Sequence, residues 1–392
     1  MLSRRLNNVT PSFTIGISNK VSELKSKGIE VVNLSIGEPD FNVPDKAKNE
    51  AIKAINNNKT KYAMVSGIKE LKNAIVEKLK NENNVHYDID EIVVSNGAKH
   101  SITNTLIAIL NPQDEVLIPK PYWVSYPEMI RLVDATPIFI DTDKNNNFKI
   151  TPEQIQKNIT AKTKMIFITN PSNPTGAIYT KEELKSIVDI CLKNNIYILA
   201  DEIYEKICYK DNFTSIASLS PEAKNITITI NGFSKSAAMT GLRLGYSASN
   251  KSIAKAISTI QGHLVSHPST ISQWAGYGSL KYCKEDINNM VKIYKQKRDL
   301  AISILSKIKD LDFIYPQGAF YIFIDISKLK SKINYKNSFS IEFCNKLLEN
   351  NKVAAVPGIA FGMDDFIRIS YACSEENIIK GLNEIKNFIE TL

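Results

Sequence analysis

The sequence predicts an α/β protein, with a mostly parallel seven-stranded sheet in a large domain and a smaller α+β domain beside it. From about residue 90 onward, seven short runs rich in β-branched residues alternate with amphipathic helical stretches, the pattern of a doubly wound domain. Several runs are continuously apolar, as expected for strands buried on both faces of a parallel sheet. The length of 392 residues also favours two domains. The runs span residues 91–95 (EIVVS), 115–118 (EVLI), 137–140 (PIFI), 164–169 (KMIFIT), 196–200 (IYILA), 225–230 (NITITI) and 244–247 (LGYS).

The stretches between the runs carry helix signals. Residues 181–194 open at Thr180 with Glu183 three residues later, a capping-box pattern that predicts the start of a helix. After a long helical region near residues 282–308, the pattern changes to short strands and helices, which indicates the smaller domain. Its expected elements are a strand at 319–324 (AFYIFI), a helix near 340–350, strands at 353–356 and 366–370, and a closing helix.

The two domains are expected to share a cleft, which is a usual place for a ligand site. We assign residues 45–287 to the large domain. An N-terminal arm and the small α+β domain take residues 1–44 and 288–392.

Composition excludes several classes of function. The 49 basic and 41 acidic residues give a net charge of +8, but the basic residues are spread along the chain, which argues against nucleic-acid binding. No apolar stretch is long enough for a membrane span, and no signal peptide is evident, so we expect a cytoplasmic protein. The cysteines show no metal-ligand spacing, and we expect reduced thiols and no metal site. They are Cys191, Cys208, Cys283, Cys344 and Cys373.

The segment of residues 231–246 (NGFSKSAAMTGLRLGY) places Lys235 just beyond the end of a predicted strand. Ligands of open α/β sheets bind outside the carboxyl ends of strands. Like-charge repulsion from Arg243 would lower the pKa of Lys235, and Schiff-base formation needs a neutral amine. Ser234 and Arg243 would suit a phosphate. A solvated loop lysine is the alternative interpretation.

The segment ADEIY (200–204) also follows an apolar run. Asp201 would hold a cofactor cation, and Tyr204 would donate a hydrogen bond beside it. The alternative is that Asp201 caps a helix.

Two further segments follow strands. NPSNPTG (170–176) is a turn-forming sequence in which Asn173 would present a rigid side-chain amide, although a plain loop has the same composition. SNGAKH (95–100) joins a strand to a helix, and its glycine and free backbone N–H groups predict an anion site at the helix N-terminus.

These four segments, in this order, resemble class I aminotransferases, together with PYWVSYPEM (121–129) and SIGEPDF (35–41). The similarity is to subgroup I-beta, the bacterial and archaeal aspartate aminotransferases, and it covers essentially the whole chain. It implies the fold of a fold type I transferase that depends on pyridoxal 5′-phosphate. The implied reaction is ping-pong transamination of aspartate with 2-oxoglutarate to oxaloacetate and glutamate, through a Schiff base of the cofactor with Lys235.

The resemblance also assigns roles to residues of the cofactor site. Lys235 would act as the catalytic base, Asp201 would keep the pyridine nitrogen protonated, and Trp123 would stack on the ring. The full set of implied cofactor-binding residues is Tyr62, Gly97, Ala98, Lys99, Trp123, Asn173, Asp201, Tyr204, Ser234, Lys235 and Arg243.

On the substrate side, Arg368 in FIRISYA resembles the arginine that binds the α-carboxylate, a function suited to a bidentate guanidinium. Tyr62 resembles a tyrosine that reaches the cofactor phosphate of the neighbouring subunit, which implies a homodimer with shared active sites. The implied substrate-binding residues are Gly37, Lys99, Trp123, Asn173 and Arg368.

Lys99 and His267 bear on specificity. A cation at a helix N-terminus is disfavoured, so another interaction should favour Lys99 there. In the I-beta enzymes, a lysine at this place helps to recognise the distal carboxylate of the substrate. A lysine that balances the phosphate charge or extends into solvent is the alternative. His267, in a segment that we expect near the cofactor mouth, departs from the small polar residues that are common in the family.

Other reactions remain open on the same scaffold. They include transamination of prephenate, aromatic amino acids or alanine, and β-elimination or decarboxylation. A ligand-sensing regulator built on an aminotransferase-like domain is the alternative from another class. Such regulators carry an N-terminal DNA-binding module, whereas only some ten residues precede the first family motif here.

Overall fold

The seven predicted runs form a single sheet in the computed structural model, which describes residues 3–11, 13–210 and 213–392. The strand order is β2-β8-β7-β6-β5-β3-β4. β8 runs antiparallel to both of its neighbours, and the other adjacent strands are parallel. The prediction of a mostly parallel seven-stranded sheet is therefore confirmed. The strands are β2 (Ile92–Ser95), β3 (Glu115–Pro119), β4 (Thr136–Ile140), β5 (Thr163–Thr169), β6 (Tyr197–Asp201), β7 (Thr227–Gly232) and β8 (Gly245–Ala248).

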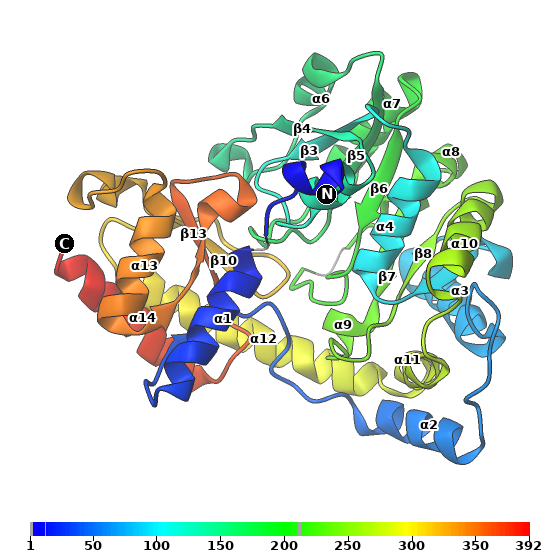
Figure 1. Ribbon diagram of the computed structural model, residues 1–392, viewed down its shortest axis with the longest axis horizontal. Helices are drawn as coiled ribbons and strands as arrows, with labels where there is room; N and C mark the ends of the chain where they lie inside the picture. The colour runs from blue at the N-terminus through cyan, green and yellow to red at the C-terminus, as the bar shows by residue number, and fades with distance from the viewer. Residues whose placement is uncertain (1–2, 12, 211–212) are drawn as a thin grey trace.

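Helices cover both faces of this sheet, as Figure 1 shows. Strand β5 illustrates why its run is apolar throughout. Met165 and Phe167 belong to a cluster with the helices of one face, and Ile166 and Ile168 belong to a cluster with those of the other. The first face is covered by α4 (Ala98–Ile109), α5 (Tyr126–Leu132) and α10 (Lys251–Val265), the second by α6 (Pro152–Asn158), α7 (Lys181–Lys193) and α8 (Pro221–Ile226).

The edge of the sheet at β2 is covered by α2 (Asp45–Asn56), α3 (Lys69–Asn83) and α11 (Thr270–Tyr282). Helices α2 and α11 approach each other closely, since a Cβ atom on Gly278 would lie 2.8 Å from the Glu50 side chain. The loop between α2 and α3 contains Tyr62.

A second sheet belongs to the later part of the chain. It is antiparallel, in the order β12-β13-β10-β9. Strand β1 (Val32–Asn33) pairs with β11 (Val353–Ala354), so the N-terminal segment joins this part of the molecule. The remaining elements are β9 (Asp312–Phe313), β10 (Tyr321–Asp325), β12 (Val356–Pro357), β13 (Phe366–Ser370), α12 (Lys284–Leu305), α13 (Phe339–Asn351) and α14 (Glu375–Glu390).

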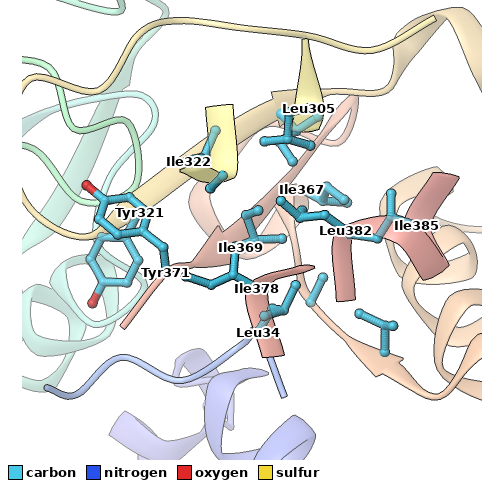
Figure 2. Packing of buried hydrophobic residues seen from close by; sticks show 14 of the residues in the cluster. Leu34, Leu305, Tyr321, Ile322, Ile367, Ile369, Tyr371, Ile378, Leu382 and Ile385 are labelled. Atoms are coloured by element: carbon cyan, nitrogen blue, oxygen red, sulfur yellow. The ribbon is translucent and has the colours of Figure 1, made fainter. Parts of the chain in front are cut away.

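Side chains from widely separated stretches of the chain make the core of this second part, as Figure 2 shows. Leu34 comes from the N-terminal segment, Leu305 ends α12, and Ile369 lies in β13 beside the residues of α14. The expected division between residues 287 and 288 falls within the first turns of α12 and stays a prediction.

The helix signals in the sequence are confirmed locally. Thr180 Oγ1 accepts a hydrogen bond from the Glu183 N–H, and the Glu183 carboxylate accepts one from the Thr180 N–H. None of the described helices is long and apolar enough to cross a membrane.

Candidate active site

The strand ends gather the predicted functional segments at one edge of the large sheet. Strands β5, β6 and β7 are parallel, so their carboxyl ends meet there. Strand β2 is antiparallel to β8, which is antiparallel to β7, so β2 ends at the same edge. The segments that follow these strands contain Asn173, Asp201, Lys235 and Gly97.

A cavity of about 660 Å³ lies at this edge. All the predicted site residues except Gly97 and Tyr62 line it. They are Gly37, Ala98, Lys99, Trp123, Asn173, Asp201, Tyr204, Ser234, Lys235, Arg243 and Arg368.

Lys235 lies in α9 (Phe233–Ser236), the short helix that begins where β7 ends. Its Nζ donates a hydrogen bond to the Gly37 carbonyl. The surrounding protein shields the amine from solvent, and this desolvation lowers the pKa of Lys235 to about 8. Glu38 opposes the shift, whereas Arg368 and Arg243 add to it. The sequence predicted the direction of the shift, but burial contributes more than the repulsion by Arg243.

Asp201 is buried at the end of β6 and faces the cavity. One carboxylate oxygen accepts from Tyr126 Oη at 2.6 Å, and the other accepts from the Ile203 N–H at 3.2 Å. Burial raises the pKa of Asp201 to about 6, although these hydrogen bonds and Lys235 act in the opposite direction. Among the described residues, no lysine or arginine forms an ion pair with Asp201. A cationic group in the cavity would therefore stabilise this carboxylate.

Arg368 is buried in β13 and also lines the cavity. Its Nη1 donates to Asn173 Oδ1 at 3.1 Å, and its Nη2 donates to the Ser35 carbonyl at 3.0 Å. Its Nε is buried and has no hydrogen-bond partner within the described part of the chain. The guanidinium stacks over the Tyr321 ring at 4.2 Å. The group retains donor capacity for an anion.

Two tyrosines form part of the cavity wall. The Tyr204 and Tyr321 hydroxyls lie 2.8 Å apart. A Cβ atom on Gly37 would lie 3.2 Å from the Tyr321 hydroxyl, so a larger residue at position 37 would crowd this wall.

The start of α4 lies against Arg243. Gly97 precedes the helix with a φ of +86°, and a Cβ atom there would lie 2.7 Å from Arg243 Nη2. The guanidinium is held by a hydrogen bond of 2.8 Å from Nη1 to the Thr240 carbonyl. A helix N-terminus, Arg243 and Ser234 together form a site for an anion such as a phosphate.

Lys99 and Trp123 lie at the mouth of the cavity. Lys99 Nζ is 5.0 Å from the centre of the Trp123 ring, and Trp123 packs edge-on against Tyr126. Desolvation and, to a lesser extent, Arg243 lower the pKa of Lys99. Lys99 is exposed and makes no ion pair with any described residue.

Sequence reasoning missed several residues of this cavity. Tyr126 lies in the PYWVSYPEM segment, but its hydrogen bond joins α5 to Asp201 at the end of β6, a contact between residues 75 positions apart. Helix α1 (Phe13–Ser26) lies along the mouth, where Thr14, Ser18 and Lys25 face the cavity. Glu38, in the SIGEPDF segment, is a further lining residue.

Two expectations concern residues outside the cavity. Tyr62 is 92% exposed and does not line it. His267 does not line this cavity but packs beside Tyr62, and its expected place near a cofactor mouth stays a prediction. Both therefore belong to a surface rather than to this chain's own cavity.

Comparison with known proteins agrees with this arrangement. Residues 29–385 match the family model for class I and II aminotransferases. The chain is 44% identical to a probable aspartate/prephenate aminotransferase of Aquifex aeolicus, covering 100% of this chain and 99% of the relative. It is 40% identical to an aspartate aminotransferase of Bacillus subtilis, with 99% of each chain covered. The crystal structure of an aspartate aminotransferase from Rhizobium meliloti superposes with a TM-score of 0.95 at 36% identity, over 100% of this chain and 99% of that one. The chain belongs to the class I and II aminotransferase family, and it is an aminotransferase with the fold type I architecture.

Proposed function

We propose that the protein transfers the amino group of aspartate to 2-oxoglutarate, with pyridoxal 5′-phosphate bound at Lys235. The observation that carries this proposal is that Lys235, Arg368 and the exposed Lys99 all line one cavity. Lys235 would carry out the proton transfers, Arg368 would bind the α-carboxylate of the substrate, and Lys99 would bind its distal carboxylate. The names of the Aquifex and Bacillus relatives support aspartate as a substrate.

The residues present fit the cofactor. Asp201 is a buried carboxylate without an ion-pair partner among the described residues, which suits a protonated pyridine nitrogen. The start of α4 and Arg243 suit the phosphate, since a Cβ atom on Gly97 would fill the space beside the guanidinium. Trp123, Asn173 and Tyr204 line the space between these two ends. When bound, pyridoxal phosphate supplies an aldehyde for an amine and a ring that accepts electrons from the substrate Cα.

The residues of this chain would divide the work. Lys235, whose pKa is about 8, would take the proton from the substrate Cα and deliver it to the C4′ carbon of the cofactor, and in the second half of the reaction it would move a proton from C4′ to the Cα of the product. Asp201 would hold the proton on the ring nitrogen. Arg368 would orient the substrate through its α-carboxylate, and Lys99 would bind the distal carboxylate.

The resemblance also supports a homodimer in which Tyr62 reaches the neighbouring subunit's cofactor phosphate. Its 92% exposure leaves the side chain available for a contact outside this chain. We likewise propose a cytoplasmic location and a division into domains of residues 45–287 and 1–44 with 288–392.

Prephenate is a second candidate amino acceptor, because the Aquifex relative is named for both activities. Prephenate also carries two carboxylates, which Lys99 and Arg368 would bind.

A steady-state screen would test the proposal. Purified protein would be assayed with aspartate, alanine and phenylalanine as donors, and with 2-oxoglutarate, oxaloacetate and prephenate as acceptors. We expect the highest kcat/KM for aspartate with 2-oxoglutarate. A preference of tenfold or more for a donor with one carboxylate would contradict the assignment, since about 1.4 kcal/mol of binding would then favour the monocarboxylate.

A further inference from the structure

We propose that His267 is a positioning residue that holds the Tyr62 loop by accepting a hydrogen bond at the neighbouring peptide, and so sets the affinity for pyridoxal phosphate in the partner subunit. The inference rests on the proposed function, in which Tyr62 contacts the phosphate of the neighbouring site. His267 lies in the corner between α10 and α11, in a different part of the same chain from the Tyr62 loop.

The Tyr62 side chain makes few contacts that would fix its orientation within this chain. The residue is 92% exposed, and its only recorded ring contact within the described part of the chain is with His267. The two ring centres are 5.8 Å apart, with the planes at 89°. Because a tyrosine in solvent has free rotamers, the backbone beside it must supply most of the orientation.

Anchors lie on both sides of this loop. Thr270 Oγ1 donates to the Lys59 carbonyl at 2.7 Å, and Gln261 Nε2 donates to the Val65 carbonyl at 2.7 Å. Between them, the Ala63 N–H donates to His267 Nε2 at 3.0 Å. The peptide that follows Tyr62 is therefore held by His267 and by neither of the flanking anchors.

The ring of His267 is held in one tautomer. Its Nδ1 lies 2.7 Å from the Pro268 carbonyl, which can only accept, so the hydrogen is on Nδ1. The other nitrogen is then free to accept from Ala63. Gln273 Nε2 donates to the same Pro268 carbonyl at 2.8 Å, and Gln273 Oε1 accepts from the Ile68 N–H at 2.7 Å. Gln273 thus holds the corner between α10 and α11 independently of His267. We therefore expect replacement of His267 to have only a local effect.

Two substitutions separate the functions of the ring nitrogens. In His267→Gln, the side-chain oxygen reaches the place of Nε2 and can accept from the Ala63 N–H. In His267→Asn, the shorter amide reaches only the place of Nδ1 and can donate to Pro268. The two variants differ by one methylene, so they form a matched pair. His86→Ala, at an exposed histidine before β2, is the control for loss of a histidine.

The experiment is a fluorescence titration of each apoenzyme with pyridoxal phosphate, together with thermal denaturation. We expect the dissociation constant to rise about three- to tenfold in His267→Asn, the range for loss of one neutral hydrogen bond, and to stay within about twofold in His267→Gln and His86→Ala. Equal dissociation constants for the Gln and Asn variants would overturn the inference. A Tm of the His267→Asn apoenzyme close to that of the wild-type apoenzyme, together with weaker cofactor binding, would support a local effect on the loop.

Tyr62→Phe separates this inference from the proposed function. If Tyr62→Phe weakens cofactor binding and His267→Asn does not, only the inference fails. If Tyr62→Phe binds the cofactor like the wild type, the shared-site assignment fails and His267 has nothing to position. In the double variant we expect the dissociation constant of Tyr62→Phe alone. A product of the two fold-changes would show that His267 acts independently and would overturn the inference.

Discussion

The floor and the rim of the cavity differ in how their side chains are held. The floor comprises Lys235, Asp201 and Arg368, each of which has hydrogen-bond partners from other parts of the chain. The rim comprises Lys99 and Lys25 of α1, which are exposed and form no ion pairs with described residues. We therefore propose that the floor determines the type of reaction and that the rim selects the substrate side chain.

Burial explains the contrast. On the floor, desolvation is the main cause that raises the pKa of Asp201 to about 6 and lowers that of Lys235 to about 8, and it outweighs the hydrogen bonds and charges nearby. At the rim, Lys99 is exposed, so solvent and salt screen its charge more than the charges on the floor, although desolvation still lowers its pKa. Substitutions on the floor should therefore affect every substrate, and substitutions at the rim should affect only some.

The largest effect is expected from Lys235→Ala. Loss of the amine that moves the Cα proton should lower kcat by at least about 10⁴-fold, while the cofactor still binds non-covalently. Steady-state assays and visible absorbance spectra would measure both. Lys255→Ala, at an exposed lysine of α10, is the matched control and should behave like the wild type. Full activity in Lys235→Ala would contradict the assignment of Lys235 as the catalytic base.

Arg368→Ala should lower kcat/KM by about a hundredfold for all amino donors alike, because the charge-assisted hydrogen bonds to the α-carboxylate are lost. The comparison needs aspartate, alanine and phenylalanine. A loss confined to aspartate would show that Arg368 recognises the substrate side chain and not the α-carboxylate that all donors share.

Lys99→Ala should lower kcat/KM for aspartate by about ten- to a hundredfold, and by much less for phenylalanine. The reason is that only aspartate brings a second carboxylate to the rim. Equal losses for the two donors would show that Lys99 does not read the second carboxylate, and would favour a function in balancing the charge of the phosphate.

A smaller effect is expected from Tyr126→Phe. The tyrosine hydroxyl lowers the pKa of Asp201 against the effect of burial, so its removal should raise that pKa further above 6. An Asp201 carboxyl that stays protonated to higher pH cannot pair with a protonated ring nitrogen. We therefore expect the acidic limb of the pH profile of cofactor binding to move to higher pH, with a loss of about fivefold at pH 6. An unchanged profile would mean that the hydrogen bond does not tune Asp201.

The sequence predicts the strands and the floor well for a physical reason. Continuously apolar runs mark strands covered on both faces, and parallel strands end at one edge, so motifs after them must meet. Lys235, Asp201 and Asn173 could thus be placed together without a structure.

The rest depends on contacts between distant segments, which no local pattern encodes. Tyr126 in α5 donates to Asp201, which lies 75 positions later at the end of β6, and residues of α1 line the cavity from the N-terminal end of the sequence. The position of His267 beside Tyr62 depends in the same way on the corner between α10 and α11. Burial also outweighed the nearby arginine as the cause of the Lys235 shift, and burial is a property of the folded chain.

A half-reaction tests the central claim most directly. Holoenzyme would be mixed with aspartate alone, without an oxo-acid acceptor, and the products would be quantified in a single turnover. We expect about one equivalent of oxaloacetate per active site and none in Lys235→Ala, since transamination stores the amino group on the enzyme in the first half of a ping-pong cycle. Release of ammonia or carbon dioxide, or no product at all, would contradict transamination and favour an elimination, a decarboxylation or a non-catalytic function.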